Sequence, residues 1–74
     1  VVAQHPRAWL WLLGSAEQGK GMYQESVKHL NRAIELNPTD SGAISIRGDS
    51  YIKLGQTELA IRDKSRAKQL GFRH

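Results

Sequence analysis

The residue types that most often carry enzyme chemistry are sparse in this chain. Its histidines stand at positions 5, 29 and 74, and it has no cysteine. Glu25 and His29 are four residues apart and could share a metal ion, but a surface ion pair or simple solvation is the far commoner reason for that spacing. Ser15 and Ser50 have no neighbouring base in a pattern that activates a hydroxyl. We therefore expect no enzyme activity, no metal site and no cofactor.

Length and composition indicate one small domain or a piece of a larger protein. A core of 74 residues supplies only about 3–5 kcal/mol of net stability. No apolar run approaches the roughly 20 residues of a membrane span. The chain begins at Val1 rather than Met, which favours an excised fragment or a processed form. Without cysteines the sequence does not report a redox compartment, and the cytoplasm is the favoured expectation.

The positive charge is concentrated near the end of the sequence. Eleven Lys and Arg against seven Asp and Glu give a net charge of +4. The stretch RDKSRAKQLGFR, from Arg62 to Arg73, contains Asp63 as its only acidic residue. A basic helix can contact phosphates, but it more often forms a solvated face, and Phe72 is the only aromatic residue of the stretch that could stack on a base. Nucleic acid is therefore an unlikely partner, and weak contact with an anionic surface is a second alternative.

The chain repeats itself with a period of 34 residues. Small residues recur where small ones stand, and aliphatic residues recur where aliphatic ones stand. The identical pairs are Gly14 with Gly48, Gly21 with Gly55, Arg32 with Arg66, Ala33 with Ala67, and Leu36 with Leu70.

Each repeat is predicted to form two helices. RAWLWLLGSAEQGKG ends in glycines that suit a helix stop, and YQESVKHLNRAIEL is ended by Asn37-Pro38. In the second copy, Asp40 or Ser41 is the expected N-cap of a helix that runs to about Leu54. The last helix begins near Glu58. The sequence thus predicts an all-α protein of two antiparallel helical hairpins.

This pattern resembles the tetratricopeptide repeat family. The family motif has a Leu-Gly pair, an aromatic residue three positions later, a Gly before the second helix, a small residue, an Ala and a closing Pro. These places are held by Leu13-Gly14, Tyr51, Gly21 and Gly55, Ser26 and Ala60, Ala33 and Ala67, and Pro38. The resemblance implies one domain over 1–74, with repeats at about 7–40 and 41–74, stacked as a right-handed superhelical fragment of an α-solenoid.

Four positions depart from the family pattern. Glu17 and Thr57 replace aromatic residues, Lys64 replaces a core residue, and Phe72 replaces the closing proline. Three of these departures lie in the second repeat. We therefore expect the last helix to pack less well than its counterpart.

The string Arg47-Gly48-Asp49-Ser50 matches a tetrapeptide that cell-adhesion receptors recognise on exposed loops. In the 34-residue register, Gly48 occupies the helix-crossing place of Gly14. The string therefore lies inside a predicted helix, which points successive side chains about 100° apart. We predict that Gly48 serves helix packing and that the chain does not bind adhesion receptors.

By resemblance, the first helix of each hairpin lines a groove that receives a peptide or a partner's helix. We expect a non-enzymatic interaction module, with Trp11 as the main anchor because tryptophan is enriched among binding hot spots. Alternatively, Trp9 and Trp11 cover a neighbouring repeat or a second copy of the chain, and the fragment stacks or self-associates. The groove residues implied by register are Ala8, Trp11, Leu12, Ser15, Gln18, Ser45, Ile46, Asp49, Ile52 and Lys53.

One subgroup of the family grips the C-terminal carboxylates of heat-shock chaperones through Lys, Asn and Arg side chains. The corresponding places here hold Trp11, Ser15, Gly42 and Ile46. None supplies a cation or an amide for a bidentate grip, so the resemblance does not extend to this clamp.

A last expectation concerns Arg47, which stands where the first repeat has Leu13. Family members with Arg at this place often carry an A-I-x-D string, which Ala60-Ile61-Arg62-Asp63 resembles. The resemblance implies that Arg47 packs its methylenes over the hairpin and grips the Asp63 carboxylate.

Overall fold

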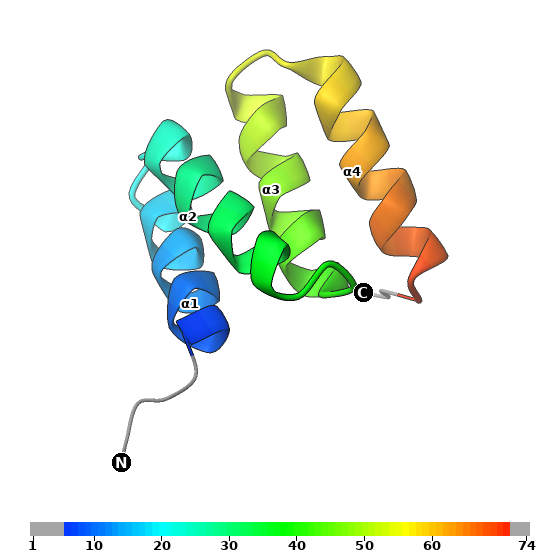
Figure 1. Ribbon diagram of the computed structural model, residues 1–74. Coiled ribbons are helices and arrows are strands. Elements are labelled where there is room, and N and C mark those ends of the chain that lie inside the picture. Colours follow the sequence, from blue (N-terminus) through cyan, green and yellow to red (C-terminus); the bar gives the residue numbers. More distant parts are fainter. Residues whose placement is uncertain (1–5, 72–74) are drawn as a thin grey trace.

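The computed structural model describes the backbone of residues 6–71 and the side chains of residues 9–71. It has four helices in this range, α1 (Pro6–Gly19), α2 (Tyr23–Leu36), α3 (Ser41–Lys53) and α4 (Thr57–Gln69). Successive helices pair as two hairpins, α1 with α2 and α3 with α4 (Figure 1). The prediction of an all-α protein built from two helical hairpins is confirmed.

The two hairpin turns repeat the same backbone geometry. Gly21 and Gly55 adopt φ values of 81° and 80°, in the left-handed region that glycine tolerates without strain. In each turn, an amide bonds a carbonyl five residues earlier, from Met22 to Glu17 at 2.8 Å and from Gln56 to Tyr51 at 2.9 Å. This is the bonding pattern of a glycine-terminated helix, and it confirms the predicted stops.

The N-terminus of α3 is capped as the sequence indicates. The carboxylate of Asp40 accepts a hydrogen bond from the backbone amide of Ala43 at 3.1 Å. Because the first amides of a helix have no partner within it, this bond fixes where α3 begins. The RGDS string lies wholly inside α3, as predicted.

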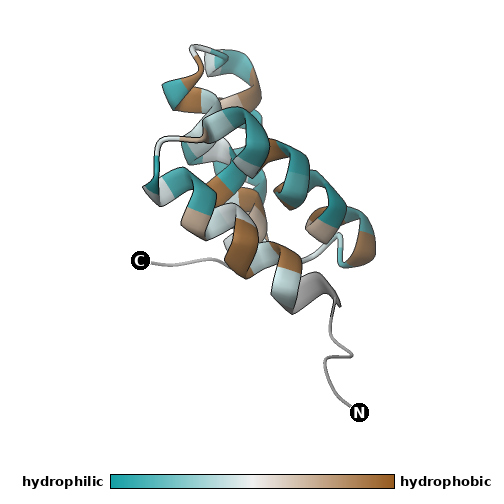
Figure 2. Ribbon diagram, turned by 90° about the vertical axis from the view of Figure 1, so that its left-hand side faces the viewer, coloured by the Kyte–Doolittle hydropathy of each residue, from teal (hydrophilic) through white to brown (hydrophobic). Residues whose placement is uncertain are grey.

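The apolar core lies between the two hairpins. Leu30 and Ala33 of α2 and Ala43 of α3 are fully buried, and partly buried apolar side chains pack around them: Leu10, Trp11, Ile34 and Ile46. Figure 2 shows hydrophobic and hydrophilic segments alternating along the helices, as expected for amphipathic helices. Among the described helices, α4 contacts only α3.

The two hairpins fill their crossing points differently. A Cβ built on Gly14 would lie 2.6 Å from Cγ of Leu30, which is fully buried. A Cβ on Gly48 would lie 3.0 Å from Cδ of Lys64, the residue that stands where the first repeat has Leu30. Lys64 runs past Gly48 and donates from Nζ to Asp49 at 2.7 Å. The expected role of Gly48 in helix packing is confirmed.

Arg47 connects the two helices of the second hairpin and also contacts the first hairpin. Its Nε and Nη2 donate to the two carboxylate oxygens of Asp63, each at 2.7 Å. Its Nη1 donates to Oδ1 of Asn31 on α2 at 2.8 Å, and its guanidinium lies over the Tyr51 ring. The Asp63 hydrogen bonds raise the pKa of Arg47 above its ordinary value, although burial acts in the opposite direction. The expected bidentate pair is confirmed.

We expect the two helix crossings, at Gly14 and at Gly48, to tolerate substitution by alanine to different extents. Gly14→Ala should lower the free energy of unfolding by about 1–3 kcal/mol, because buried Leu30 cannot withdraw from the new methyl group. Gly48→Ala should lower it by less than Gly14→Ala does, because its contacts, 3.0 Å to Cδ of Lys64 and 3.1 Å to Cβ of Asp63, are less severe than the 2.6 Å contact at Gly14 and alanine favours the helix. Gly48→Leu should again cost about 1–3 kcal/mol. Urea denaturation followed by circular dichroism measures all three. Equal losses for the two alanine variants would contradict the difference between the crossings.

The Arg47 and Asp63 pair predicts a measurable coupling. In a double-mutant cycle of Arg47→Met and Asp63→Asn, we expect a coupling energy of about 1–3 kcal/mol, since the Asp63 side chain is only 9% exposed. The exposed Arg32–Glu35 pair, whose side chains are 63% and 65% exposed, is the matched control and should show almost no coupling. Similar coupling in both cycles would show that burial does not strengthen the Arg47 pair.

Candidate functional site

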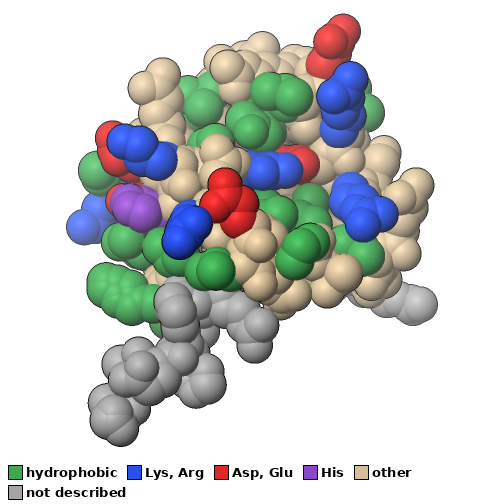
Figure 3. Space-filling view, in the orientation of Figure 1, with side chains coloured by type: hydrophobic (Ala, Val, Ile, Leu, Met, Phe, Trp, Pro, Cys, Tyr) green, Lys and Arg blue, Asp and Glu red, His purple; other side chains and the backbone are tan. Residues whose placement is uncertain are grey.

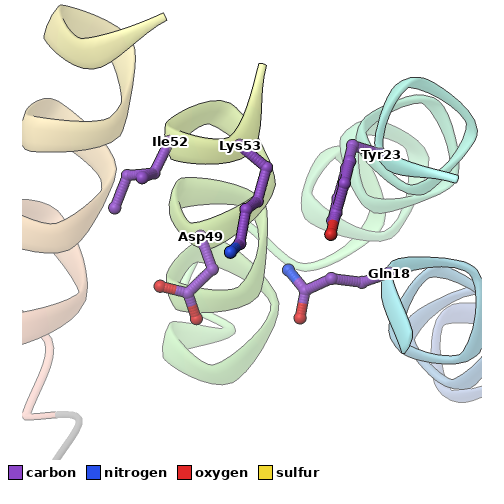
Figure 4. A pocket seen from close by; sticks show the side chains of 5 residues that line it. All are labelled: Gln18, Tyr23, Asp49, Ile52 and Lys53. Atoms are coloured by element: carbon purple, nitrogen blue, oxygen red, sulfur yellow. The ribbon is translucent and has the colours of Figure 1, made fainter. Parts of the chain in front are cut away.

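A pocket of about 430 Å³ opens at the end of the molecule where α1 finishes and α2 begins (Figure 4). Five side chains from three helices line it: Gln18, Tyr23, Asp49, Ile52 and Lys53. Gln18 comes from α1, Tyr23 opens α2, and the other three belong to the last turns of α3. The pocket therefore lies between the two hairpins.

The wall of this pocket on α1 is held by a chain of hydrogen bonds. Nε2 of Gln18 donates to the backbone oxygen of Ile46 at 2.8 Å and to Oγ of Ser50 at 2.9 Å. Oγ of Ser50 donates to Ser26 at 3.1 Å, and Oγ of Ser26 donates to the carbonyl of Gly14 at 2.8 Å. Ser26 and Ser50 are fully buried, so these bonds satisfy polar groups that water does not reach. The network fixes α1, α2 and α3 relative to one another.

Of the two charged side chains that line the pocket, Asp49 is in an ion pair within the described residues and Lys53 is not. Oδ1 of Asp49 accepts from Nζ of Lys64 at 2.7 Å, and the same ammonium donates to Oγ of Ser45 at 3.2 Å. Lys64 therefore neutralises Asp49. Lys53 takes part in no ion pair within the described side chains, and Figure 4 shows its ammonium on the same side of α3 as Gln18. The pocket keeps one positive charge beside the exposed side chain of Ile52.

The structure brings together four of the residues expected to form the groove, namely Gln18, Asp49, Ile52 and Lys53. The others lie elsewhere. Ser45 is buried beneath the Lys64 ammonium, and Ile46 packs against the core. Ser15 is half-buried on α1 and does not line this pocket, and the side chain of Ala8 lies outside the described residues.

Trp11 lies partly in the core and partly at the surface. Its indole packs against the core cluster of Leu30, Ala33 and Ala43 while remaining half-buried. A Cβ on Gly42 would lie 3.3 Å from Nε1 of Trp11, so the indole passes close to the backbone at the start of α3. Trp11 therefore contributes to stacking of the hairpins and keeps an accessible edge.

A second pocket, of about 320 Å³, lies on α1 and is lined by Trp9, Leu12 and Leu13. These three residues are called the α1 flank below. Leu12, which was expected in the groove, lies here instead of beside Gln18 and Lys53.

Sequence reasoning did not place Tyr23 in the site. A signal for it existed, because Tyr23 opens its helix at the place where the second repeat has Thr57. The partner of His29 also differs from the one considered from the sequence. Nδ1 of His29 lies 2.7 Å from Oε1 of Glu17 on α1, whereas Glu25 is an exposed residue of the first turn of α2.

The described residues contain neither a metal-binding cluster nor a membrane-spanning helix. No group of three or more His, Cys, Asp or Glu side chains in this part of the chain is arranged to hold a metal ion. None of its helices combines the length and apolar character needed to cross a bilayer.

Comparison with known families identifies the fold. Residues 8–40 match the tetratricopeptide repeat model, a span that covers all of α2 and all of α1 except its first two residues. The chain belongs to the tetratricopeptide repeat family. The second hairpin follows at the 34-residue register and has the same turn geometry. Repeats of this family are typically interaction modules rather than catalytic ones, so the chain is a protein-interaction module in the general sense.

Three curated relatives come from Arabidopsis thaliana. The FAM10 family protein At4g22670 is 41% identical over 69% of this chain, and the TPR repeat-containing thioredoxin TDX is 35% identical over 66% of it. Hsp70-Hsp90 organizing protein 3 is 37% identical over 73% of the chain. The aligned parts make up 12%, 13% and 11% of these relatives' own lengths. The likeness therefore concerns the repeat region and not the whole of any relative.

Proposed function

We propose that the pocket between the two hairpins binds an extended peptide or a helix of a partner protein. The observation that carries this proposal is the meeting of Gln18, Asp49, Ile52 and Lys53, from two different helices, around one cavity. The resemblance to the repeat family assigns the same four residues to its groove. The pocket is also large enough for one or two side chains of a bound segment.

The chemistry of the pocket suits a mixed apolar and polar segment. Ile52 is 53% exposed and offers apolar surface to an aliphatic side chain. Lys53 and the hydroxyl of Tyr23 supply hydrogen-bond donors for a carbonyl or a carboxylate. Asp49 adds little negative charge because Lys64 neutralises it. An apolar residue followed by a group that accepts hydrogen bonds therefore fits this pocket best.

Trp11 is proposed as an additional anchor along the same face. Its accessible edge lies on α1, the helix that also carries Gln18. A partner segment that extends from the pocket toward the start of α3 would meet the indole beside Gly42. Tryptophan in such a half-buried setting offers a large contact area at little entropic cost.

The proposed partner does not bind through a carboxylate clamp. Some relatives are named as Hsp70-Hsp90 organizing proteins, but the clamp places of this chain hold Trp11, Ser15, Gly42 and Ile46. Ile46 packs against the core, and the indole of Trp11 lies beside Gly42. Neither place offers a cation, so a chaperone carboxylate would find no bidentate partner there.

The basic α4 helix supports binding of an anionic partner less well than the pocket supports binding of a peptide. Lys64 is paired with Asp49 of α3, and Asp63 is paired with Arg47. On the face shown in Figure 3, basic, acidic and hydrophobic side chains are interspersed and form no continuous basic patch. We therefore prefer the protein partner to nucleic acid.

If peptides bind in this pocket, substitution of Ile52 should weaken their binding selectively. Peptides selected on the chain from a random phage-displayed library should bind Ile52→Asp at least tenfold more weakly, because a charge replaces the apolar contact. Ile61→Asp is the matched control, since Ile61 is 59% exposed but lies on α4. Fluorescence anisotropy measures the affinities, and circular dichroism confirms equal helicity. Equal affinity for both variants would place the binding site outside the pocket.

Trp11→Ala tests the anchor. The affinity of the same peptides should fall by about 2 kcal/mol while the helical content at low temperature is kept. Some loss of thermal stability is expected, because the indole touches the core. Complete unfolding of the variant, or unchanged affinity in a folded variant, would instead assign Trp11 to covering the hairpin interface.

A further inference from the structure

Asp49 and Lys53 are spaced to pair with each other on α3. They are four residues apart with the acid on the N-terminal side, which is the favoured arrangement of an ion pair on one helix face. Among the described side chains this pair does not form. Oδ1 of Asp49 accepts instead from Nζ of Lys64 on α4 at 2.7 Å, and Figure 4 shows the Lys53 ammonium on the Gln18 side of Asp49. Two lysines therefore compete for one carboxylate, and Lys64 binds it.

The packing of Lys64 gives it an advantage over Lys53 in this competition. Its methylenes run past Gly48, where a Cβ would lie only 3.0 Å from Cδ of the lysine. Its ammonium also donates to Oγ of buried Ser45 at 3.2 Å. Lys53 by contrast is an exposed residue of the last turn of α3. Because Lys64 is already ordered by these contacts, it loses less side-chain entropy on pairing with Asp49 than Lys53 would lose.

Lys53 is the cation through which the pocket meets a ligand. Both amide hydrogens of Gln18 are used, by the carbonyl of Ile46 and the hydroxyl of Ser50, so this side chain offers only an acceptor. The remaining donors among the five side chains that line the pocket are the ammonium of Lys53 and the hydroxyl of Tyr23. A carboxylate placed here gains a charge-assisted hydrogen bond, whereas a positively charged side chain is repelled.

We propose that Lys64 determines the specificity of this pocket, and that the segment bound there places an Asp or Glu side chain against Lys53. By holding the Asp49 carboxylate, Lys64 keeps it from pairing with Lys53 and leaves that ammonium to the ligand. This specificity rests on the peptide-binding function proposed above and adds to it the charge of the bound segment. The first repeat has Leu30 at the place of Lys64 and lacks the arrangement.

Peptide selection tests the acidic preference without a known partner. A random library is displayed with the C-terminus of each peptide fused to the coat protein, so that no terminal carboxylate is free. The pool selected on the intact chain should be about twofold richer in Asp and Glu than the unselected library, and selection on Lys64→Met should lose this enrichment. Lys68→Met is the matched control. It removes the same charge from an exposed lysine of α4, and the enrichment should remain.

A pair of amidated peptides, with Glu or Gln at the enriched position, locates the contact. By fluorescence anisotropy, the intact chain should bind the Glu peptide about fivefold more tightly, as expected for one exposed ion pair. Lys53→Met and Lys64→Met should each abolish this preference by weakening the Glu peptide alone, whereas Lys64→Arg should keep it. Adding Asp49→Asn to Lys64→Met should restore the preference, because no carboxylate then competes for Lys53. A merely structural role of Lys64 does not predict this restoration.

The variants are chosen so that the fold is kept. Lys64→Met retains the methylenes that pass Gly48, and circular dichroism checks its helicity. If the helicity falls, Lys64→Gln takes its place, because it is also uncharged and its amide can still donate to Asp49.

Three results would overturn the role of Lys64. They are a selected pool no richer in acidic residues than the library, an equal preference for the Glu peptide in Lys64→Met and Lys68→Met, and equal weakening of both peptides by Lys64→Met. Peptides that lack an acidic preference but bind Ile52→Asp more weakly would refute this specificity and leave the peptide pocket standing. Peptides that Ile52→Asp binds as tightly as the intact chain does would refute the pocket itself.

Discussion

The bidentate pair between Arg47 and Asp63 controls how the second hairpin is held. Among the described helices α4 contacts only α3, so the bonds between these two helices decide where α4 lies. Asp63 is almost buried, and a carboxylate there is tolerated only with a charged partner. Because Arg47 also reaches Asn31, the same guanidinium ties α4, α3 and α2 together. A single side chain thus links the internal geometry of one hairpin to its stacking on the other.

The two hairpins reach the same geometry by different physical means. In the first, the gap left by Gly14 is filled by buried Leu30, and the contact is apolar. In the second, the gap left by Gly48 carries the methylenes of Lys64, whose ammonium continues to Asp49 and Ser45. In the proposed binding pocket, Lys64 pairs with Asp49, so Lys53 supplies the unpaired charge. The replacement of a core leucine by Lys64 therefore changes the charge of the proposed binding surface.

The first helix participates in two surfaces of different character. Its C-terminal end carries Gln18, whose amide is used in the network with Ser50 and Ile46, so the wall of the pocket is rigid. Its earlier turns expose the α1 flank, whose residues are wholly apolar. A segment bound in the pocket would meet polar groups already fixed in place, which lowers the entropic cost of binding.

The sequence by itself determined the elements and one tertiary contact. Gly21 and Gly55 ended helices because only glycine adopts their positive φ without strain, Asp40 capped α3, and the resemblance to the repeat family paired Arg47 with Asp63. The tertiary structure alone decided which groove residues share a cavity. It grouped Gln18, Asp49, Ile52 and Lys53 with Tyr23, placed Leu12 on the flank and buried Ser45 beneath Lys64. Helical periodicity assigns a residue to a face of its own helix, but a cavity depends on how two hairpins are rotated against each other. That rotation is set by the Ser26, Ser50 and Gln18 network and by the Arg47 bonds, whose joint geometry no single stretch of sequence contains.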